Sequence, residues 1–139
     1  MRRVFVDTGA WDAIEDDGDP HHTRALQFKN EISEKCVLVT SDYVLDETFT
    51  LLLMNIGYER TILFGQTIET LRRTGVLQVI HVMATQFAEA WEVFQRFNKD
   101  KSWSFTDCTT HVIMKQMGIQ EAFAFDRHFE QMGFFRFPN

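Results

Sequence analysis

Short apolar runs rich in β-branched residues alternate with longer segments along this sequence, and that alternation constrains the fold more than any other feature. The runs are RRVFVD (2–7), CVLVT (36–40), VLQVIHV (76–82) and AFAF (122–125). Segments of helical length separate them, as in βαβ crossovers that join parallel strands. The sequence therefore predicts an α/β fold: one domain over residues 1–139, in three layers, with a mainly parallel central sheet and helices on both faces.

Residues typical of helix starts and ends bound the segments between these runs. Asp19 and Pro20 are a favoured N-cap and first helical residue, and Ser41 is a favoured N-cap for the next helix. Gly57 is the kind of residue that ends a helix. Helices are therefore expected over residues 20–34, 42–56, 58–74, 84–98 and 106–118, followed by a short helix and the segment FFRF (134–137).

The composition is that of a globular protein. The 139 residues are 45% hydrophobic and include 14 Phe, which is enough for one buried core. Phe87, Trp91 and Phe94 recur at helical spacing and are assigned to that core. The longest aliphatic patch, LLLM (51–54), is far too short to span a membrane, and the N-terminal apolar run is too short for a secretory signal. These features favour a cytoplasmic protein with no membrane contact.

Charge and cysteine content narrow the kinds of site to expect. The net charge of −6 argues against a broad basic surface for nucleic acid, but not against an enzyme that holds nucleic acid through metal ions and a local basic rim. Cys36 and Cys108 form no CxxC motif, so neither a zinc ribbon nor a redox motif is indicated. Reduced thiols are favoured, with a disulfide between them left open.

Two acidic residues stand where predicted strands end. Asp7 closes the first apolar run, and Asp126 directly follows the last one. In parallel α/β sheets, sites form outside the carboxyl ends of the strands. We therefore expect these two carboxylates at the same edge of the sheet.

Two further acids lie in the first halves of predicted helices. Glu47 shares a helical row with Leu51 and Met54, a row that we expect to be packed, so its charge needs a partner unless it reaches water at the helix edge. Asp107 borders the apolar stripe of the helix 106–118 and lies in its first turn. A local explanation for Asp107 is that it complements the helix N-terminus.

Taken together, the four acids indicate a metal site. Carboxylates that converge at one end of a sheet repel one another unless a cation or raised pKa values relieve the repulsion. An oxygen-only set points to Mg²⁺ or Mn²⁺, and such ions assist phosphodiester cleavage. We therefore predict a catalytic, metal-ligating site formed by Asp7, Glu47, Asp107 and Asp126. His111, four residues after Asp107, is expected to face solvent instead of acting as a ligand.

The segments around these acids carry a family resemblance. VDTGAW (6–11), DYVLDETFTLL (42–52), SFTDCTTHVIMKQMGI (104–119) and AFAFDRHFEQMGF (122–134) resemble, in order and spacing, the PIN-domain endoribonucleases and especially the VapC-type toxins of bacterial toxin–antitoxin pairs. The match spans essentially the whole chain and implies a PIN-like fold. It also implies that Asp7, Glu47 and Asp107 ligate a catalytic metal, and that Asp126 holds a second ion or the attacking water.

The resemblance implies supporting residues as well. Thr8 matches a small polar residue that often follows the first acid, and Ser104 and Thr106 match a hydroxyl-bearing turn before the third. Ala124 departs from the family, which often has Thr or Ser two residues before the last Asp. The role of Asp126 is therefore the least defined of the four.

Candidate RNA contacts and partners complete the prediction. Trp11 and Trp103 lie close in sequence to acids and could stack on bases, with packing as the alternative, and Arg127 is a candidate RNA contact. The expected substrate is RNA, as a single strand or a structured loop. The resemblance implies a homodimer and a small antitoxin that presents an Arg to the acids. The alternatives are a weak or inactive PIN-like module that binds RNA or protein, and a housekeeping RNA-processing nuclease.

Overall fold

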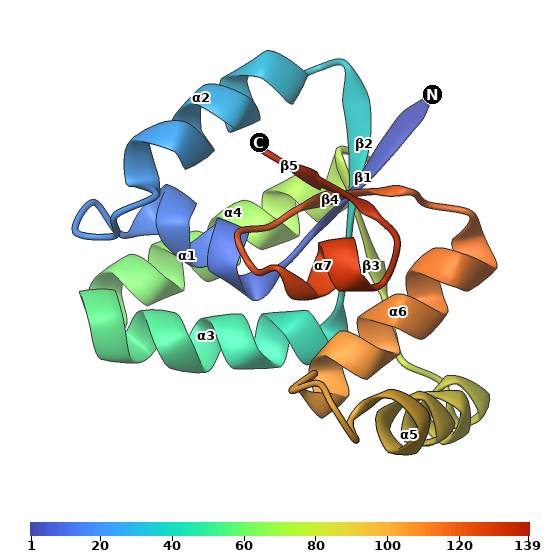
Figure 1. The fold of residues 1–139 in the computed structure, drawn as a ribbon. Helices are drawn as coiled ribbons and strands as arrows, with labels where there is room; N and C mark the ends of the chain where they lie inside the picture. Colours follow the sequence, from blue (N-terminus) through green and yellow to red (C-terminus); the bar gives the residue numbers. More distant parts are fainter.

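The computed structural model describes residues 1–139 and has a central sheet between two sets of helices (Figure 1). The strands are β1 (Arg2–Val6), β2 (Cys36–Ser41), β3 (Leu77–Ile80), β4 (Glu121–Phe123) and β5 (Phe135–Phe137). Their order in the sheet is β3-β2-β1-β4-β5, and every neighbouring pair is parallel. The predicted α/β class with a parallel sheet is confirmed, and the FFRF segment, which the sequence left without an assignment, contains a fifth strand.

Helices cover both faces of the sheet. They are α1 (Thr8–Glu15), α2 (His22–Ile32), α3 (Asp42–Ile56), α4 (Tyr58–Arg73), α5 (Ala84–Phe97), α6 (Phe105–Met117) and α7 (His128–Gln131). In Figure 1, α1 to α4 lie on one side of the sheet, and α5 and α6 lie on the other. No helix is both long and apolar enough to cross a membrane.

One predicted helix start is wrong. The sequence placed it at Pro20 with Asp19 as the N-cap, but α2 begins at His22. Oδ1 of Asp19 accepts a hydrogen bond from the backbone N–H of His21 at 2.7 Å. Asp19 therefore closes a local turn one residue ahead of the helix, a competing use of the Asp side chain that capping preferences do not distinguish.

The strand order sets where a site can form. β1 lies in the centre and pairs with β2 on one side and β4 on the other. The chain winds outward from β1 to β2 and β3, and then returns across the sheet to β4. Val6 pairs with Phe123, so the carboxyl ends of β1 and β4 lie side by side. This is the point where strand order reverses, and ligands of open α/β sheets bind outside such ends.

The central strand is buried, whereas part of the aromatic stripe of α5 is exposed. Val4, Phe5 and Val6 of the central strand are fully buried. The prediction that Phe87 and Trp91 belong to the core is wrong, because they are 49% and 51% exposed. Their helix, α5, packs against α6 and has no further layer outside it, so its aromatic stripe extends beyond the contact.

The two thiols are reduced and buried. Cys36 and Cys108 are free cysteines. Burial raises the pKa of both, and that of Cys108 rises to about 11. The disulfide that the sequence left open is not formed.

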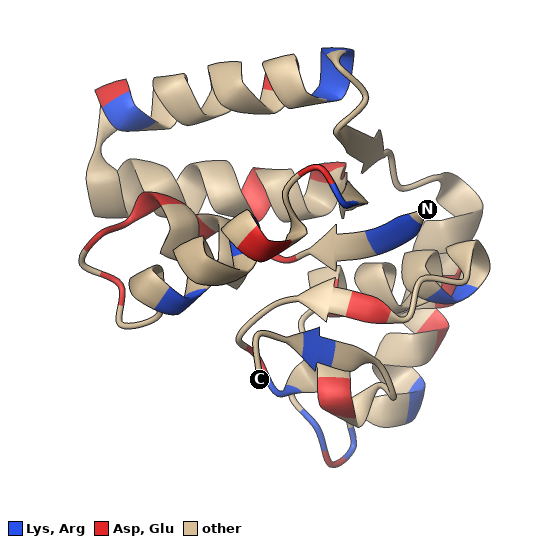
Figure 2. Cartoon of the chain, turned by 90° about the horizontal axis from the view of Figure 1, so that it is seen from above, with Lys and Arg blue, Asp and Glu red and all other residues tan.

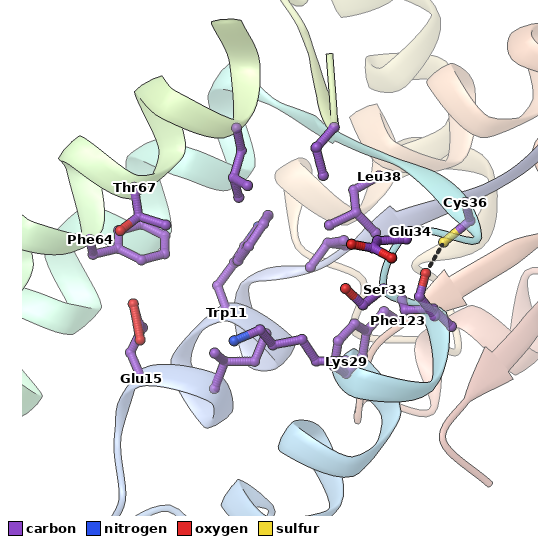
Figure 3. A pocket seen from close by; sticks show the side chains of 15 residues that line it. Trp11, Glu15, Lys29, Ser33, Glu34, Cys36, Leu38, Phe64, Thr67 and Phe123 are labelled. Atoms are coloured by element: carbon purple, nitrogen blue, oxygen red, sulfur yellow. Dashed lines mark hydrogen bonds between the residues drawn. The ribbon is translucent and has the colours of Figure 1, made fainter. Parts of the chain in front are cut away.

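A cavity of about 170 Å³ lies between the sheet and the helices α1, α2 and α4 (Figure 3). Its walls come mainly from α1, α2, α4 and β2, and they include the apolar side chains of Trp11, Leu38, Phe64 and Phe123. None of the four predicted acids lines it. Trp11 therefore faces this apolar space.

Candidate metal centre

Asp7 stands at the junction of the central strand and the first helix. Its backbone N–H donates to the carbonyl of Phe123 at 3.0 Å, which extends the β1–β4 pairing by one residue. Its carbonyl accepts from the N–H groups of Ala10 and Trp11 at 3.1 Å and so starts α1. Its side chain makes no capping hydrogen bond. The backbone N–H and carbonyl of Asp7 are therefore both hydrogen-bonded, whereas its carboxylate does not cap α1.

The electrostatics of Asp7 bring the four acids together. Burial raises the pKa of Asp7, and the charges of Asp107, Glu47 and Asp126 raise it further. A hydrogen bond from the backbone of Thr8 acts in the opposite direction, and the resulting pKa is about 7. Since the other three carboxylates all act on Asp7, the fold places the predicted acids within electrostatic reach of one another.

Asp107 has a local and a long-range role at once. It forms a capping box with Ser104: Oγ of Ser104 accepts from the N–H of Asp107, and Oδ2 of Asp107 accepts from the N–H of Ser104, both at 3.0 Å. The same Oδ2 lies 2.7 Å from Nδ1 of His128. Asp107 is only 9% exposed. The side chain thus satisfies the start of α6 and still belongs to the acidic group.

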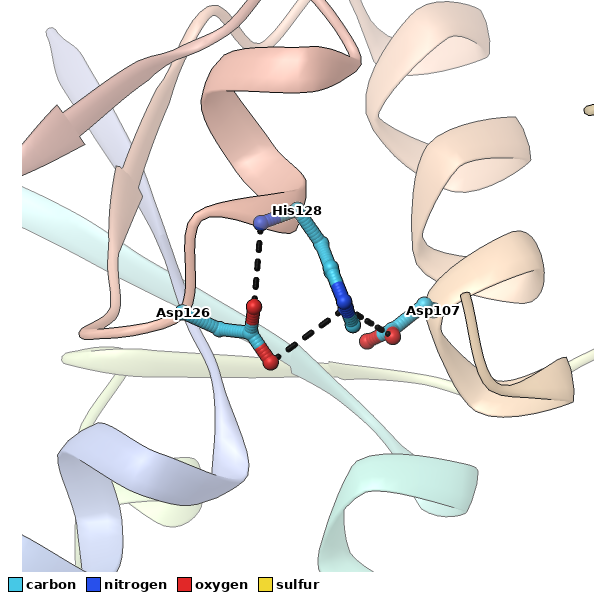
Figure 4. A group of neighbouring side chains, drawn as sticks. All are labelled: Asp107, Asp126 and His128. Carbon is cyan, nitrogen blue, oxygen red and sulfur yellow. Dashed lines mark hydrogen bonds and ion pairs between the residues drawn. The ribbon is translucent and has the colours of Figure 1, made fainter. Parts of the chain in front are cut away.

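Asp126 is held from one side by His128 (Figure 4). Oδ1 of Asp126 accepts from the backbone N–H of His128 at 3.0 Å, and its Oδ2 lies 3.2 Å from Nδ1 of the ring. One ligand atom each from Asp107, Asp126 and His128 lie within 4.8 Å of one another. His128 is therefore a site residue that the sequence analysis missed. The signal was present as an Asp-x-His pattern at the start of a short helix.

Thr8 connects Asp7 to the helix that carries Glu47. Its hydroxyl donates to the carbonyl of Val44 at 3.2 Å and lies 3.4 Å from Oε2 of Glu47. Oγ1 of Thr48 lies 3.3 Å from the same hydroxyl. The polar residue after the first acid therefore contacts the second acid.

The environment expected for Glu47 is wrong. Glu47 is exposed, and Met54 on the same row is 77% exposed, so this row is not packed. The buried face of α3 includes Val44, Leu45 and Leu52 instead. Glu47 is therefore open to solvent, and it borders an open, shallow depression that Thr8 also lines.

The remaining hydroxyl and cationic predictions have mixed outcomes. Ser104 acts on the site through the capping box with Asp107. The carbonyl of Thr106 accepts from Oγ1 of Thr109, and its own hydroxyl bonds to none of the acids. Ala124 is fully buried, so its methyl group packs in the core. Arg127 is exposed beside Asp126 and forms no ion pair.

Neither tryptophan is available for base stacking. Trp11 is 5% exposed and packs edge-on against Phe64, and Trp103 is 3% exposed and stacks on Phe97. Nε1 of Trp103 donates to Oε1 of Gln131 at 2.8 Å. The predicted stacking on RNA is therefore wrong for both residues, and packing is correct. The sequence could not separate these outcomes, because proximity along the chain to an acid does not fix the direction of a side chain.

His111 does not face solvent, contrary to the prediction. Its ring is half-buried among Phe97, Trp103 and Phe134, with ring centroids 5.9–6.2 Å apart. Burial lowers the pKa of His111, which favours the neutral form of the ring, and the charge of Lys115 acts in the same direction. Aromatic neighbours from three segments cover it, and a helical wheel of α6 alone does not show them. It is not a member of the acidic group.

The donor set fits a hard divalent cation. Four carboxylates meet at one edge of the sheet, where one of them is buried enough to have a pKa near neutrality. A cation at this edge would relieve their repulsion and favour the ionised form of Asp7. Carboxylate oxygens are the ligands that Mg²⁺ and Mn²⁺ prefer.

Comparison with known proteins identifies the family of this chain. The model of the PIN domain family matches residues 4–135. The 23S rRNA-specific endonuclease VapC20 of Mycobacterium tuberculosis is 36% identical over 131 residues, which cover 94% of this chain and 95% of the relative. The crystal structure of M. tuberculosis VapC20, described as a sarcin–ricin loop cleaving toxin, has a TM-score of 0.82 at 35% identity, over 94% of this chain and 95% of that chain.

A more distant structure shows that the fold is shared beyond close relatives. FitAcB from Neisseria gonorrhoeae has a TM-score of 0.66 at 12% identity, over 97% of this chain and 96% of that chain. The matches confirm the resemblance to VapC-type toxins that the four acidic segments indicated, and they show that this chain belongs to the PIN-domain family.

Proposed function

We propose that this protein is a divalent-metal-dependent endoribonuclease and the toxin of a toxin–antitoxin pair. The observation that carries the proposal is the convergence of four carboxylates, from β1, α3, α6 and the segment after β4, at one edge of the sheet. The similarity to VapC20 over 94% of the chain supports the same reaction class. A module that only bound RNA would gain nothing from clustered negative charge facing phosphate.

Each acid has a distinct part in the proposed site. Asp7, Glu47 and Asp107 hold one Mg²⁺ or Mn²⁺ ion, and Asp126 holds a second ion or orients the attacking water. When bound, such an ion supplies Lewis-acid stabilisation of the phosphate and of the leaving oxygen. The protein's own contribution is to fix the carboxylates: Thr8 contacts Glu47, and Ser104 binds Asp107.

The proposed substrate is a structured RNA loop. VapC20 is named for 23S rRNA, and its structure is described as that of a sarcin–ricin loop cleaving toxin. Proteins recognise such loops through shape and unpaired bases more than through a duplex groove. Lys and Arg positions are spread over strands, helices and loops in this chain (Figure 2), so a broad basic surface does not select the RNA. Arg127, which is exposed and forms no ion pair next to Asp126, is proposed to bind a backbone phosphate.

Metal dependence tests the proposal directly. A synthetic sarcin–ricin loop hairpin is expected to be cut when Mg²⁺ or Mn²⁺ is added to metal-free protein, and not in chelator, because four uncompensated carboxylates repel phosphate. The measurement is a divalent-metal titration of cleavage products on a denaturing gel. A linear strand of the same sequence reports how much the loop shape contributes. Equal cleavage in chelator and in Mn²⁺ would show that the proposed chemistry is wrong.

The proposed partner is a small antitoxin protein. An inhibitor that reaches the four acids is expected to use an Arg, since the guanidinium fork matches carboxylate geometry. A protein that cuts RNA and binds such an antitoxin is proposed to work in the cytoplasm. Binding of such a partner is expected to compete with Mn²⁺.

Exposed apolar side chains support a homodimer. Leu53 and Leu63, on α3 and α4, are 52% and 60% exposed, and Trp91 on α5 is 51% exposed. Burying such side chains stabilises an interface by about 25 cal/mol per Å² of apolar surface. A dimer mass is therefore expected by light scattering at tens of micromolar, and a monomer mass would remove this expectation. Leu53→Glu and Trp91→Glu, made separately, would locate the interface. The substitution that lies within the interface is expected to give a monomer mass by light scattering.

A further inference from the structure

A histidine side chain, that of His128, lies between the carboxylates of Asp107 and Asp126. His128, the first residue of α7, places Nδ1 2.7 Å from Oδ2 of Asp107 and 3.2 Å from Oδ2 of Asp126 (Figure 4). Its side chain is 22% exposed, so the ring is largely enclosed. The two carboxylates come from segments separated by 19 positions, and this imidazole is what joins them.

The hydrogen bonds of Asp107 define which of its oxygens remains free. Oδ2 accepts from the backbone N–H of Ser104 at 3.0 Å and lies against Nδ1 of His128. Oδ1 accepts no hydrogen bond from the protein. With both donors on one oxygen, the carboxylate is fixed in rotation and the other oxygen is left for a cation.

Asp126 depends on the same residue for both of its oxygens. The backbone N–H of His128 binds Oδ1, and the ring lies against Oδ2. The side chain of Asp126 is 45% exposed. A carboxylate that exposed would sample several rotamers on its own, and ordering it after binding a metal would cost free energy.

We propose that His128 is a positioning residue of the metal site: Nδ1 holds Asp107 and Asp126 together and orients them toward the ion, without itself binding the ion. The inference rests on the proposed function. A nitrogen-to-oxygen distance of 2.7 Å is the length of a strong hydrogen bond, and because a carboxylate oxygen only accepts, Nδ1 is the donor to Asp107. Direct ligation through Nδ1 would break this bond. Residues that orient metal ligands in this way often change metal affinity by about 10–100-fold when removed.

Two isosteric replacements separate the roles of the ring nitrogens. The side-chain N–H₂ of Asn can occupy the position of Nδ1, whereas that of Gln reaches toward the position of Nε2. We expect His128→Asn to bind Mn²⁺ within about threefold of the wild type. His128→Gln and His128→Leu are expected to bind it about 10–100-fold more weakly. His81→Leu is the matched control, because His81 is an exposed imidazole paired with Asp42 at 3.5 Å, outside the group that could hold the metal.

The measurement is direct binding of Mn²⁺ to metal-free protein, by calorimetry and by the electron paramagnetic resonance signal of free Mn²⁺. Thermal melts in chelator show whether each variant is folded. Two results overturn the inference: equal Mn²⁺ affinity in wild type, His128→Gln and His128→Leu, or a coupling from a directly bound imidazole nitrogen in the pulsed resonance spectrum of the wild type. No Mn²⁺ binding by the wild type would instead overturn the proposed function on which it rests.

Discussion

Asp7→Asn is expected to abolish RNA cleavage and, in the absence of metal, to leave the protein more stable than the wild type. Removing one preorganised group of an active site typically costs about 10²–10³-fold in rate, and a ligand shared by the whole site is expected to cost at least that. Stability should change in the opposite direction, because Asp7 is buried beside three other acids. Rates on the loop hairpin and melting temperatures in chelator measure the two effects.

The pH dependence of the stability effect follows from the pKa of Asp7. The pKa is raised from its ordinary value of 3.8 to about 7 on folding. Between these values the folded protein holds a proton that the unfolded chain has lost, so stability falls as pH rises and the full cost is present above pH 7. The Asn side chain has no such cost. The advantage of Asp7→Asn in chelator is therefore expected to be largest near pH 8 and to shrink toward pH 5.

Asp12→Asn is the matched control for this experiment. Asp12 is also a buried carboxylate, five residues after Asp7, and burial raises its pKa as well. Its Oδ1 accepts from Asn55 at 3.2 Å, and it is not among the four acids. Cleavage by Asp12→Asn is expected to match the wild type. If both variants lost activity equally, or if Asp7→Asn retained it, the assignment of Asp7 as a ligand would be wrong.

The effect of metal on Asp107 is the second large prediction. At a hundredfold excess over its dissociation constant, Mn²⁺ is expected to stabilise the wild type by about 2.7 kcal/mol, or roughly 10 °C in melting temperature. Asp107→Asn should gain far less from Mn²⁺. In chelator it is expected to melt at or above the wild type, because the amide oxygen can still accept from Ser104 while the repulsion among the acids is reduced. The ranking of the two proteins therefore reverses on adding Mn²⁺.

Ser104→Ala isolates the helix-capping contribution. It removes the hydroxyl that accepts from the N–H of Asp107 and leaves the charge of Asp107 in place. It should lower stability by about 1 kcal/mol, the usual cost of losing such a cap, with and without Mn²⁺. If Asp107→Asn instead melted below the wild type by the same margin in both conditions, Asp107 would be a cap and nothing more.

The parts of the structure that were predictable from sequence depend on local patterns. Hydrophobic periodicity, helix-capping residues and acids at the ends of apolar runs can all be recognised within short stretches of sequence. They predicted the parallel α/β class and four of the strands. The family's order of acids then indicated four carboxylates, and the electrostatics of Asp7 place them near one another. The catalytic roles of these four residues stay predictions.

The features that sequence reasoning missed depend on contacts between distant segments. His128 belongs to the site because α7 folds back against the start of α6, 21 residues away in the chain. His111 is half-buried because aromatic rings from three segments pack around it. Trp11 is buried because it points into the interior, where it packs against Phe64 of α4 and lines the cavity between the sheet and the helices. In each case the residues that fix the environment of the side chain lie in another segment, so the sequence around the residue does not contain them.

The strand order also governs when this enzyme can first act. The first strand of the sheet along the chain, β1, lies in its centre, and the strand that completes its other side, β4, comes only after β2 and β3. Asp7 consequently has no contact with Asp107 and Asp126 until the segment from α6 to β4 has been translated. A nascent chain whose residues from α6 onward are still in the ribosome's exit channel has no assembled site, so the four carboxylates can act together only after β4 has left that channel.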